Sequence, residues 1–305
     1  MFTFKAKQKI FEIGGVKVGG QPGELPTVLI GSIFYFGHTK IDLDEKKGTF
    51  NKEKAEALIR NQETFSDMTG NPGMLEVVGI RPEALINEID YIADVTKMPF
   101  LISSERPSVL MAGAQHVAEV GLQDRVVYSS ILMGTSDEEL EIIKNSKIKA
   151  ALLLAKNPAG ETAAAKLQIA KEVLKLAEKA KIEKPLIDAA SLAFGIRMGP
   201  AVRAINLIKN EYGYPVGVAP GNLTTTFDWA KKRLTREALR ATYGAFCAIP
   251  QIMGANWLLY GPLQHAAYVF PSVAMTDSYI LTAMAELGVK PADPAKHPFL
   301  RLVKG

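Results

Sequence analysis

The chain has 305 residues, of which 48% are hydrophobic and 22% charged, a composition that is typical of a globular protein with a large core. The formal net charge of +4 is small for this length, and Lys and Arg are interleaved with Asp and Glu, so no nucleic-acid-binding surface is indicated. The sequence has one cysteine, Cys247, so an internal disulfide framework and a cysteine-rich metal site are excluded. Cys247 lies in an apolar run.

The first 25 residues contain two short strand-like segments, FTFKAKQKIFEI and VKVGG, with Gly14-Gly15 between them. Paired glycines favour a tight turn, so we predict an antiparallel hairpin that plugs the bottom of a barrel. Residues 26–33 follow as a buried strand. The acidic residues in the polar loop after it, which contains His38, do not have the spacing of an EF-hand, so we interpret this segment as a solvated or lid loop.

From residue 51 onward, helical and strand patterns alternate regularly. One predicted helix ends at Gly70, and another begins at Ser136, which stands in a capping-box relation to Glu139. Eight apolar runs, each followed by a helical pattern, begin near residues 27, 74, 99, 125, 150, 185, 215 and 256. We therefore predict one α/β domain over 1–305, a (β/α)8 TIM barrel with an N-terminal β-hairpin. A doubly wound open sheet is the alternative, but neither GxGxxG after the first strand nor GxxxxGK[ST] occurs.

The stretch PVGVAPGNLTTT runs from a short apolar strand into Gly221-Asn222 and then toward a helix start near Phe227. Pro220 and Gly221 end the strand, and one of the three threonines at 224–226 is suited to cap that helix. We predict that a loop presents Asn222 at the carboxyl end of a strand, where α/β proteins bind ligands. The alternative is that Asn222 only forms a turn.

In a barrel, the chemistry is expected at the carboxyl ends of the strands. The segments there carry hydrogen-bonding groups and few charges: Ser32, Val78-Gly79, Ser103-Ser104-Glu105, Ser129-Ser130, Ala155-Lys156-Asn157, Asp188, Asn222 and Gly261. This ring lacks the histidine and carboxylate cluster of a metal hydrolase, so no metal site is expected. Lys156 comes closest to a Schiff-base lysine, but we interpret it as an exposed loop residue. The ring suits a flat, polar heterocycle, because Asp accepts paired N–H groups and Asn either donates or accepts.

Several motifs carry a family resemblance: GGQPG, LPTVLIGSIFY, TGNPG, MAGA, PLIDAA and WLLYGP. The chain that contains them resembles the H-subunit family of tetrahydromethanopterin S-methyltransferase. Relatives of that family include bacterial methylcorrinoid:tetrahydrofolate methyltransferases, and the wider group of pterin-binding barrels includes dihydropteroate synthase. The resemblance covers nearly the whole chain and is specific in its first half.

The resemblance implies that Asp188 pairs with the aminopyrimidine edge of a pterin and that the amide of Asn222 reaches N5. The chain departs from the family at two strand ends, where Ser103 replaces the usual Asp and Ser129 the usual Asn. One carboxylate is thereby lost, and Glu105, two residues after Ser103, is the candidate to supply it. The expected pterin-binding residues are Asp188, Asn222, Ser103, Ser129, Gly221 and Glu105, with Asn222 as the catalytic group.

The activity that the resemblance implies is methyl transfer between a methylcorrinoid and N5 of tetrahydrofolate or tetrahydromethanopterin, without a protein nucleophile. Asn222 would stabilise the changing charge at N5. One alternative is a dihydropteroate-synthase-like enzyme, although the region around WLLYGP offers no direct phosphate-binding Arg or Lys. The other alternative is a subunit that binds a pterin without turnover.

We expect the cobalamin or other corrinoid to be carried by a separate partner protein that docks transiently over the barrel mouth. The chain has no cobalamin-binding DxHxxG motif, since His38 is followed by Thr-Lys-Ile-Asp. The relatives suggest a homodimer. We find no N-terminal signal segment and no long uncharged apolar run, so a cytoplasmic protein without an integral membrane segment is expected.

Overall fold

The computed structural model describes residues 2–45, 47–156, 162–195 and 197–304. In this part of the chain, eight parallel strands close into a barrel in the order β10-β3-β4-β5-β6-β7-β8-β9. The barrel strands are β3 (Val28–Ile33), β4 (Gly73–Val78), β5 (Phe100–Ser103), β6 (Val126–Leu132), β7 (Ala150–Leu154), β8 (Lys184–Asp188), β9 (Val216–Val218) and β10 (Trp257–Pro262). The predicted TIM barrel is confirmed, and each strand begins within one residue of its predicted start.

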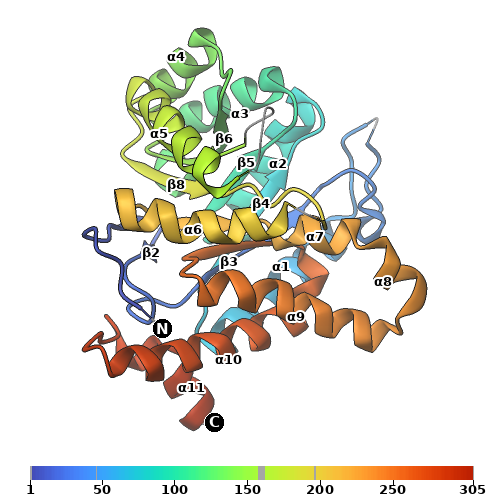
Figure 1. The fold of residues 1–305 in the computed structure, drawn as a ribbon. Coiled ribbons are helices and arrows are strands. Elements are labelled where there is room, and N and C mark those ends of the chain that lie inside the picture. Colours follow the sequence, from blue (N-terminus) through green and yellow to red (C-terminus); the bar gives the residue numbers. More distant parts are fainter. Residues whose placement is uncertain (1, 46, 157–161, 196, 305) are drawn as a thin grey trace.

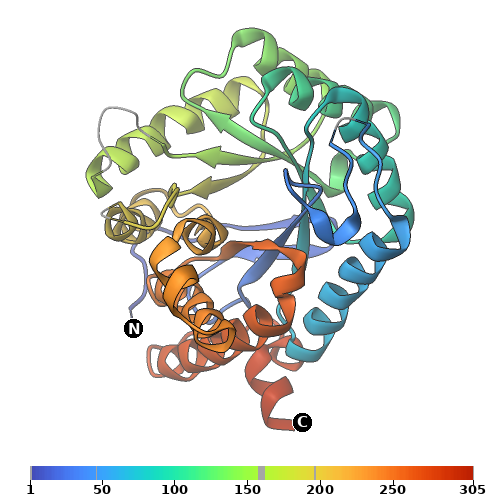
Figure 2. The same cartoon turned by 90° about the vertical axis from the view of Figure 1, so that its right-hand side faces the viewer.

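Helices surround the strands on all sides (Figures 1 and 2). They are α1 (Lys52–Thr69), α2 (Pro82–Val95), α3 (Pro107–Glu119), α4 (Asp137–Ser146), α5 (Ala163–Lys179), α6 (Met198–Tyr212), α7 (Pro220–Thr226), α8 (Asp228–Arg233), α9 (Arg236–Ile252), α10 (Ala266–Ala285) and α11 (Pro298–Lys304). The described residues also form four 3-10 turns: η1 (Thr39–Ile41), η2 (Gln123–Arg125), η3 (Leu263–His265) and η4 (Pro294–Lys296). Within the described ranges, no helix combines the length and the hydropathy that are needed to cross a bilayer.

The N-terminal hairpin closes the amino-terminal end of the barrel. Its strands β1 (Ile10–Ile13) and β2 (Val16–Gly19) pair antiparallel, with Gly14-Gly15 at the turn as predicted. Ile13 and Val18 are buried against the inward-facing side chains of the barrel strands, which include Trp257. Figure 1 shows the hairpin at the end of the barrel opposite to α7 and α8. The hairpin therefore excludes water from the base of the barrel and leaves the other end open.

Two local predictions at helix starts need correction. Ser136 caps α4 by accepting a hydrogen bond from the Glu139 backbone N–H (3.2 Å), but the Glu139 carboxylate accepts the Tyr128 hydroxyl (2.7 Å), so only half of a capping box forms. The threonines at 224–226 do not cap a helix at Phe227, because they belong to the short helix α7. Thr225 and Thr226 donate their hydroxyls to the Asn222 carbonyl instead, a bond that keeps them inside the helix.

Gly217 makes the closure of the barrel between β9 and β10 possible. It pairs with Trp257, which is fully buried, and a Cβ atom at residue 217 would lie 2.2 Å from the Trp257 ring. We expect Gly217→Ala to lower the free energy of unfolding by at least about 1–3 kcal/mol through overpacking, as measured by urea denaturation. Gly199→Ala in the first turn of α6 is the control, because no described atom lies within 4 Å of the added methyl group. Equal effects of the two substitutions would contradict this account.

Candidate functional site

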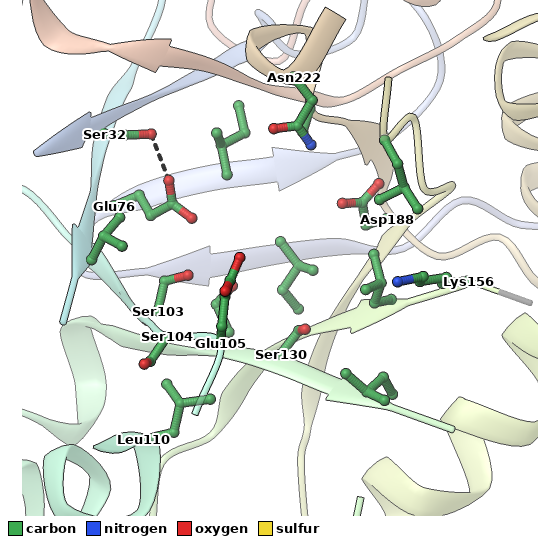
Figure 3. A pocket seen from close by; sticks show the side chains of 18 of the residues that line it. Ser32, Glu76, Ser103, Ser104, Glu105, Leu110, Ser130, Lys156, Asp188 and Asn222 are labelled. Carbon is green, nitrogen blue, oxygen red and sulfur yellow. Dashed lines mark hydrogen bonds between the residues drawn. The ribbon is translucent and has the colours of Figure 1, made fainter. Parts of the chain in front are cut away.

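A pocket of about 720 Å³ opens at the carboxyl ends of the barrel strands. The structure brings all six predicted site residues to this one pocket: Ser103, Glu105, Ser129, Asp188, Gly221 and Asn222. Figure 3 shows side chains from opposite walls of the barrel pointing into the same space. Its volume is within the range of small-molecule sites. The parallel, closed sheet explains this convergence, because it places every strand's carboxyl end at one mouth.

Asp188 is the last residue of β8 and lies almost fully buried in the pocket wall. Its Oδ1 accepts a hydrogen bond from the Ala190 backbone N–H (2.7 Å), and the described residues offer no bond to its other oxygen. Burial raises the pKa of Asp188 to about 7, and the charge of Glu76 acts in the same direction. The Ala190 hydrogen bond and the nearby Lys166 ammonium act in the opposite direction and lower the pKa. One oxygen of Asp188 is therefore available to a ligand, and a hydrogen-bond donor on that ligand would stabilise the ionised form of Asp188.

Glu76 is a pocket residue that the sequence interpretation missed. It lies in β4, where Met74, Glu76 and Val78 alternate on the inner face, so its carboxylate points into the pocket (Figure 3). The Ser32 hydroxyl donates to its Oε2 at 2.5 Å. Burial raises the pKa of Glu76, while hydrogen bonds from Ser32 and Ser103 lower it. A charged residue at an inward position of an otherwise apolar strand was the signal available in the sequence.

Glu105 lies at the mouth pocket, but it does not belong to the strand whose alternation was expected to orient it. Strand β5 ends at Ser103, so strand alternation does not extend to residue 105, and Glu105 is exposed at the pocket rim. Glu76, from the neighbouring strand, interacts with Ser103 instead. Glu76 thus brings a carboxylate beside Ser103 from the neighbouring strand, while Glu105 lies further out in the same pocket.

Asn222 lies in the first turn of α7 and not on a loop. The amide Nδ2 has one long hydrogen bond, to the Ser191 carbonyl at 3.4 Å, and the residue lines the pocket. Gly221 allows this placement, because a Cβ atom there would lie 2.8 Å from the backbone of Gly261 in β10. Close packing of α7 on β10 therefore fixes where the Asn222 amide can reach.

Lys156 is exposed, as interpreted, but it also lines the pocket, and Figure 3 shows its side chain pointing into the pocket on the same side as Asp188. Asn157, which we placed at the same strand end, lies outside the described residues. In the described parts of the chain, no three His, Cys, Asp or Glu side chains gather as a metal site would require. Cys247 is buried, and burial raises the pKa of its thiol to about 12, as fits a core residue.

The closed barrel defines this chain as a TIM-barrel protein, and the polar, carboxylate-bearing pocket at its mouth is its candidate ligand site. Residues 6–292 match the family described as tetrahydromethanopterin S-methyltransferase MtrH subunit, and the chain belongs to this family. The resemblance inferred from the motifs is thereby confirmed.

Relatives in methanogens match over nearly their full length. The H-subunit of tetrahydromethanopterin S-methyltransferase from Methanothermobacter thermautotrophicus is 40% identical, with 99% of this chain and 100% of the relative covered. The corresponding protein from Methanocaldococcus jannaschii is 39% identical with the same coverage. The matched regions therefore include the whole barrel.

Solved structures of similar fold include two dihydropteroate synthases. The enzyme from Xanthomonas albilineans with 4-aminobenzoic acid has a TM-score of 0.60 at 18% identity, covering 94% of this chain and 100% of that one. The enzyme from Yersinia pestis has a TM-score of 0.62 at 10% identity, covering 88% and 98%. At these identities the likeness is one of fold.

We expect Asp188→Asn to stabilise the protein more at high pH than at low pH. The fold raises the pKa of Asp188 from 3.8 to about 7, so the folded state holds this proton more tightly than the unfolded chain does. The wild type therefore loses stability as the pH rises from about 4 to about 7, by at most about 4 kcal/mol, and the variant does not. Urea denaturation at pH 4.5 and pH 8 measures the difference. The exposed Asp94→Asn is the control, and a larger gain at pH 4.5 would contradict the account.

Proposed function

We propose that this chain is a methyltransferase that moves a methyl group between a protein-bound corrinoid and N5 of a reduced pterin held in the mouth pocket. The observation that carries the proposal is the convergence of Asp188, Glu76 and the Asn222 amide on one pocket. The relatives are named for tetrahydromethanopterin, which makes it the first co-substrate to test, with tetrahydrofolate second.

The carboxylates of Asp188 and Glu76 suit the nitrogen-rich ring of a pterin. A carboxylate accepts paired N–H groups, and such charge-assisted bonds are stronger than neutral ones. Asp188 takes the aminopyrimidine edge, and Glu76 supplies the acceptor that the family's usual Asp would provide at the position of Ser103. The hydroxyls of Ser103 and Ser129 face the same pocket and adapt to donors or acceptors.

Asn222 acts at N5. The reaction forms a bond between the methyl carbon and N5 and breaks the cobalt–carbon bond, with the electron pair left on cobalt and the N5 proton released. The Asn222 amide can accept the N5–H bond before transfer or donate to the N5 lone pair after it. Because it responds to the charge that develops at N5, we expect it to contribute about 2–4 kcal/mol to the transition state.

The corrinoid reaches the pocket on a second protein. The sequence lacks a cobalamin motif of its own, and the pocket opens at the barrel mouth. Beside α7, Phe194 stacks on Phe227 with ring centroids 3.9 Å apart, and Phe194 and Trp229 are both substantially exposed. An exposed aromatic cluster next to the pocket supports docking of a protein partner there.

The test combines calorimetric titration of tetrahydromethanopterin and tetrahydrofolate with methyl transfer from methylcobalamin. We expect Asp188→Ala to weaken pterin binding about 10- to 100-fold, because it removes a charged acceptor. Asn222→Ala should lower the transfer rate about 100- to 1,000-fold with little change in pterin affinity.

Glu76→Gln should weaken pterin binding at least about 10-fold, whereas Glu178→Gln removes the same charge at an exposed position of α5 outside the pocket and serves as its matched control. Pterin binding without transfer, even when corrinoid proteins are added, would support a binding subunit instead. Unchanged affinity in both Asp188→Ala and Glu76→Gln would refute the proposed pocket.

We further propose that the chain forms a homodimer through the outer face of α10 and of residues 241–252 in α9. Residues 241–252 contain no Asp, Glu, Lys or Arg, and the one such residue in α10, Asp277, is buried. Exposed apolar side chains on this face are Ile249, Ile252, Met275 and Tyr279. The 20 residues of α10 span about 30 Å, so two helices present roughly 600 Å² per copy, close to the ~800 Å² of a standard interface.

A two-fold axis brings this face against itself, so a face without charges meets no like charge on its partner. Met275→Asp would place two carboxylates in the interface. We expect sedimentation equilibrium to give twice 33.1 kDa for the wild type and a single-chain mass for Met275→Asp. Met68→Asp, at an exposed position of α1, should remain dimeric. A monomeric wild type would overturn this part of the proposal.

A further inference from the structure

Lys166 is a fully buried lysine that the proposed mechanism has not used. It lies on the inner face of α5 together with alanine and valine residues, at the helical spacing of buried positions: Ala163, Lys166, Ala170, Val173 and Ala177. Burying an ammonium group is costly, and an aliphatic residue would fit the pattern of this face at lower cost. The presence of a charge here therefore indicates a role beyond packing.

A short chain of hydrogen bonds connects Lys166 to Asp188. The Lys166 ammonium donates to the Ala190 carbonyl oxygen at 3.1 Å, and the Ala190 backbone N–H donates to Asp188 Oδ1 at 2.7 Å. Ala190 has a φ of +57°, a conformation that a residue with a side chain adopts only when its surroundings hold it there. The bond from Lys166 holds the carbonyl of this residue, and its N–H is thereby directed at one oxygen of Asp188.

The charges around Asp188 oppose one another. Among the described residues, Glu76 of β4 faces it with a like charge, Lys166 of α5 lies behind it, and Lys156 lines the same pocket from the end of β7. Burial and Glu76 both favour the protonated form, and the Ala190 hydrogen bond and Lys166 favour the ionised form. Lys166 is the cation of this group that solvent does not screen, because it is completely buried.

We propose that Lys166 is a positioning residue that holds the Asp188 carboxylate oriented and ionised, so that Asp188 can accept the N–H groups of a ligand. The identity of that ligand as a pterin rests on the proposed function, but the effect of Lys166 on Asp188 does not. Helix α5 supplies no predicted site residue, but through Lys166 it acts on Asp188 in the pocket wall.

The test follows the ionisation of Asp188 in the ligand-free, full-length protein. Aspartate carboxyl groups are labelled with 13C, and the Asp188 signal is assigned by its loss in Asp188→Asn. Lys166→Met removes both charge and hydrogen bond, Lys166→Gln removes the charge but keeps a donor, and Lys166→Arg keeps the charge. We expect the titration midpoint to rise by about one pH unit or more in the Met and Gln variants and by less in the Arg variant.

Lys209→Met is the matched control. Lys209 is also fully buried on a helix, where its ammonium donates to the Gly20 carbonyl (3.0 Å) and to Asn256 Oδ1 (2.5 Å) near the hairpin end of the barrel. This variant should lose thermal stability without moving the Asp188 midpoint. If the Lys166 variants also lose stability but leave the midpoint where the wild type has it, Lys166 is merely structural and the proposal fails. If Lys166→Met does not fold, the Gln and Arg variants decide.

A ligand titration separates this proposal from the proposed function. Pterin affinity should fall as acid protonates Asp188, and this loss should move to higher pH in Lys166→Gln. If the Asp188 midpoint shifts in the Lys166 variants but the wild type binds no pterin, the role of Lys166 is supported and the pterin site is refuted. If pterin binding depends on Asp188 but the midpoint is the same in the Lys166 variants and the wild type, the pterin site is supported and the role of Lys166 is refuted.

Discussion

The close approach of β9 and α7 to β10 is the constraint on which the site depends. Gly217 leaves room for the Trp257 ring, and Gly221 and Gly261 lie so close that a side chain on Gly221 would meet the other backbone. This contact completes the barrel, and it also holds Asn222 over the same opening that Asp188 lines. Closure of the fold and assembly of the pocket are therefore consequences of one set of backbone contacts.

The strand and helix pattern was predictable because its physical basis is local. Alternating apolar runs, a glycine pair at the hairpin turn and Gly70 after α1 act through neighbouring residues, so they can be recognised without tertiary information. Asp188 and Asn222 were found because each follows directly on an apolar strand pattern. The same reasoning overlooked Glu76, because it searched for polar groups after the strands and not within them.

Other parts of the site depend on contacts that a sequence pattern does not contain. Lys166 lies in a Lys- and Glu-rich helix, where a lysine is expected to face solvent, and only its packing against the β8 end reveals otherwise. The threonines after Asn222 favour a helix cap by type, but their hydroxyls bond within α7. The interaction of Glu76 with Ser103 becomes visible only when β4 is placed beside β5.

The carboxylates of Asp188 and Glu76, which both line the mouth pocket, couple the stability of the fold to ligand binding. A compound with paired N–H donors would satisfy these carboxylates only in the folded state, and any molecule that binds the folded state alone raises the melting temperature by mass action. Compounds that bind these carboxylates more tightly would therefore raise the melting temperature further. Thermal shift across a panel of heterocycles would rank them by how well they complement this pair, without a corrinoid partner or an assay of turnover.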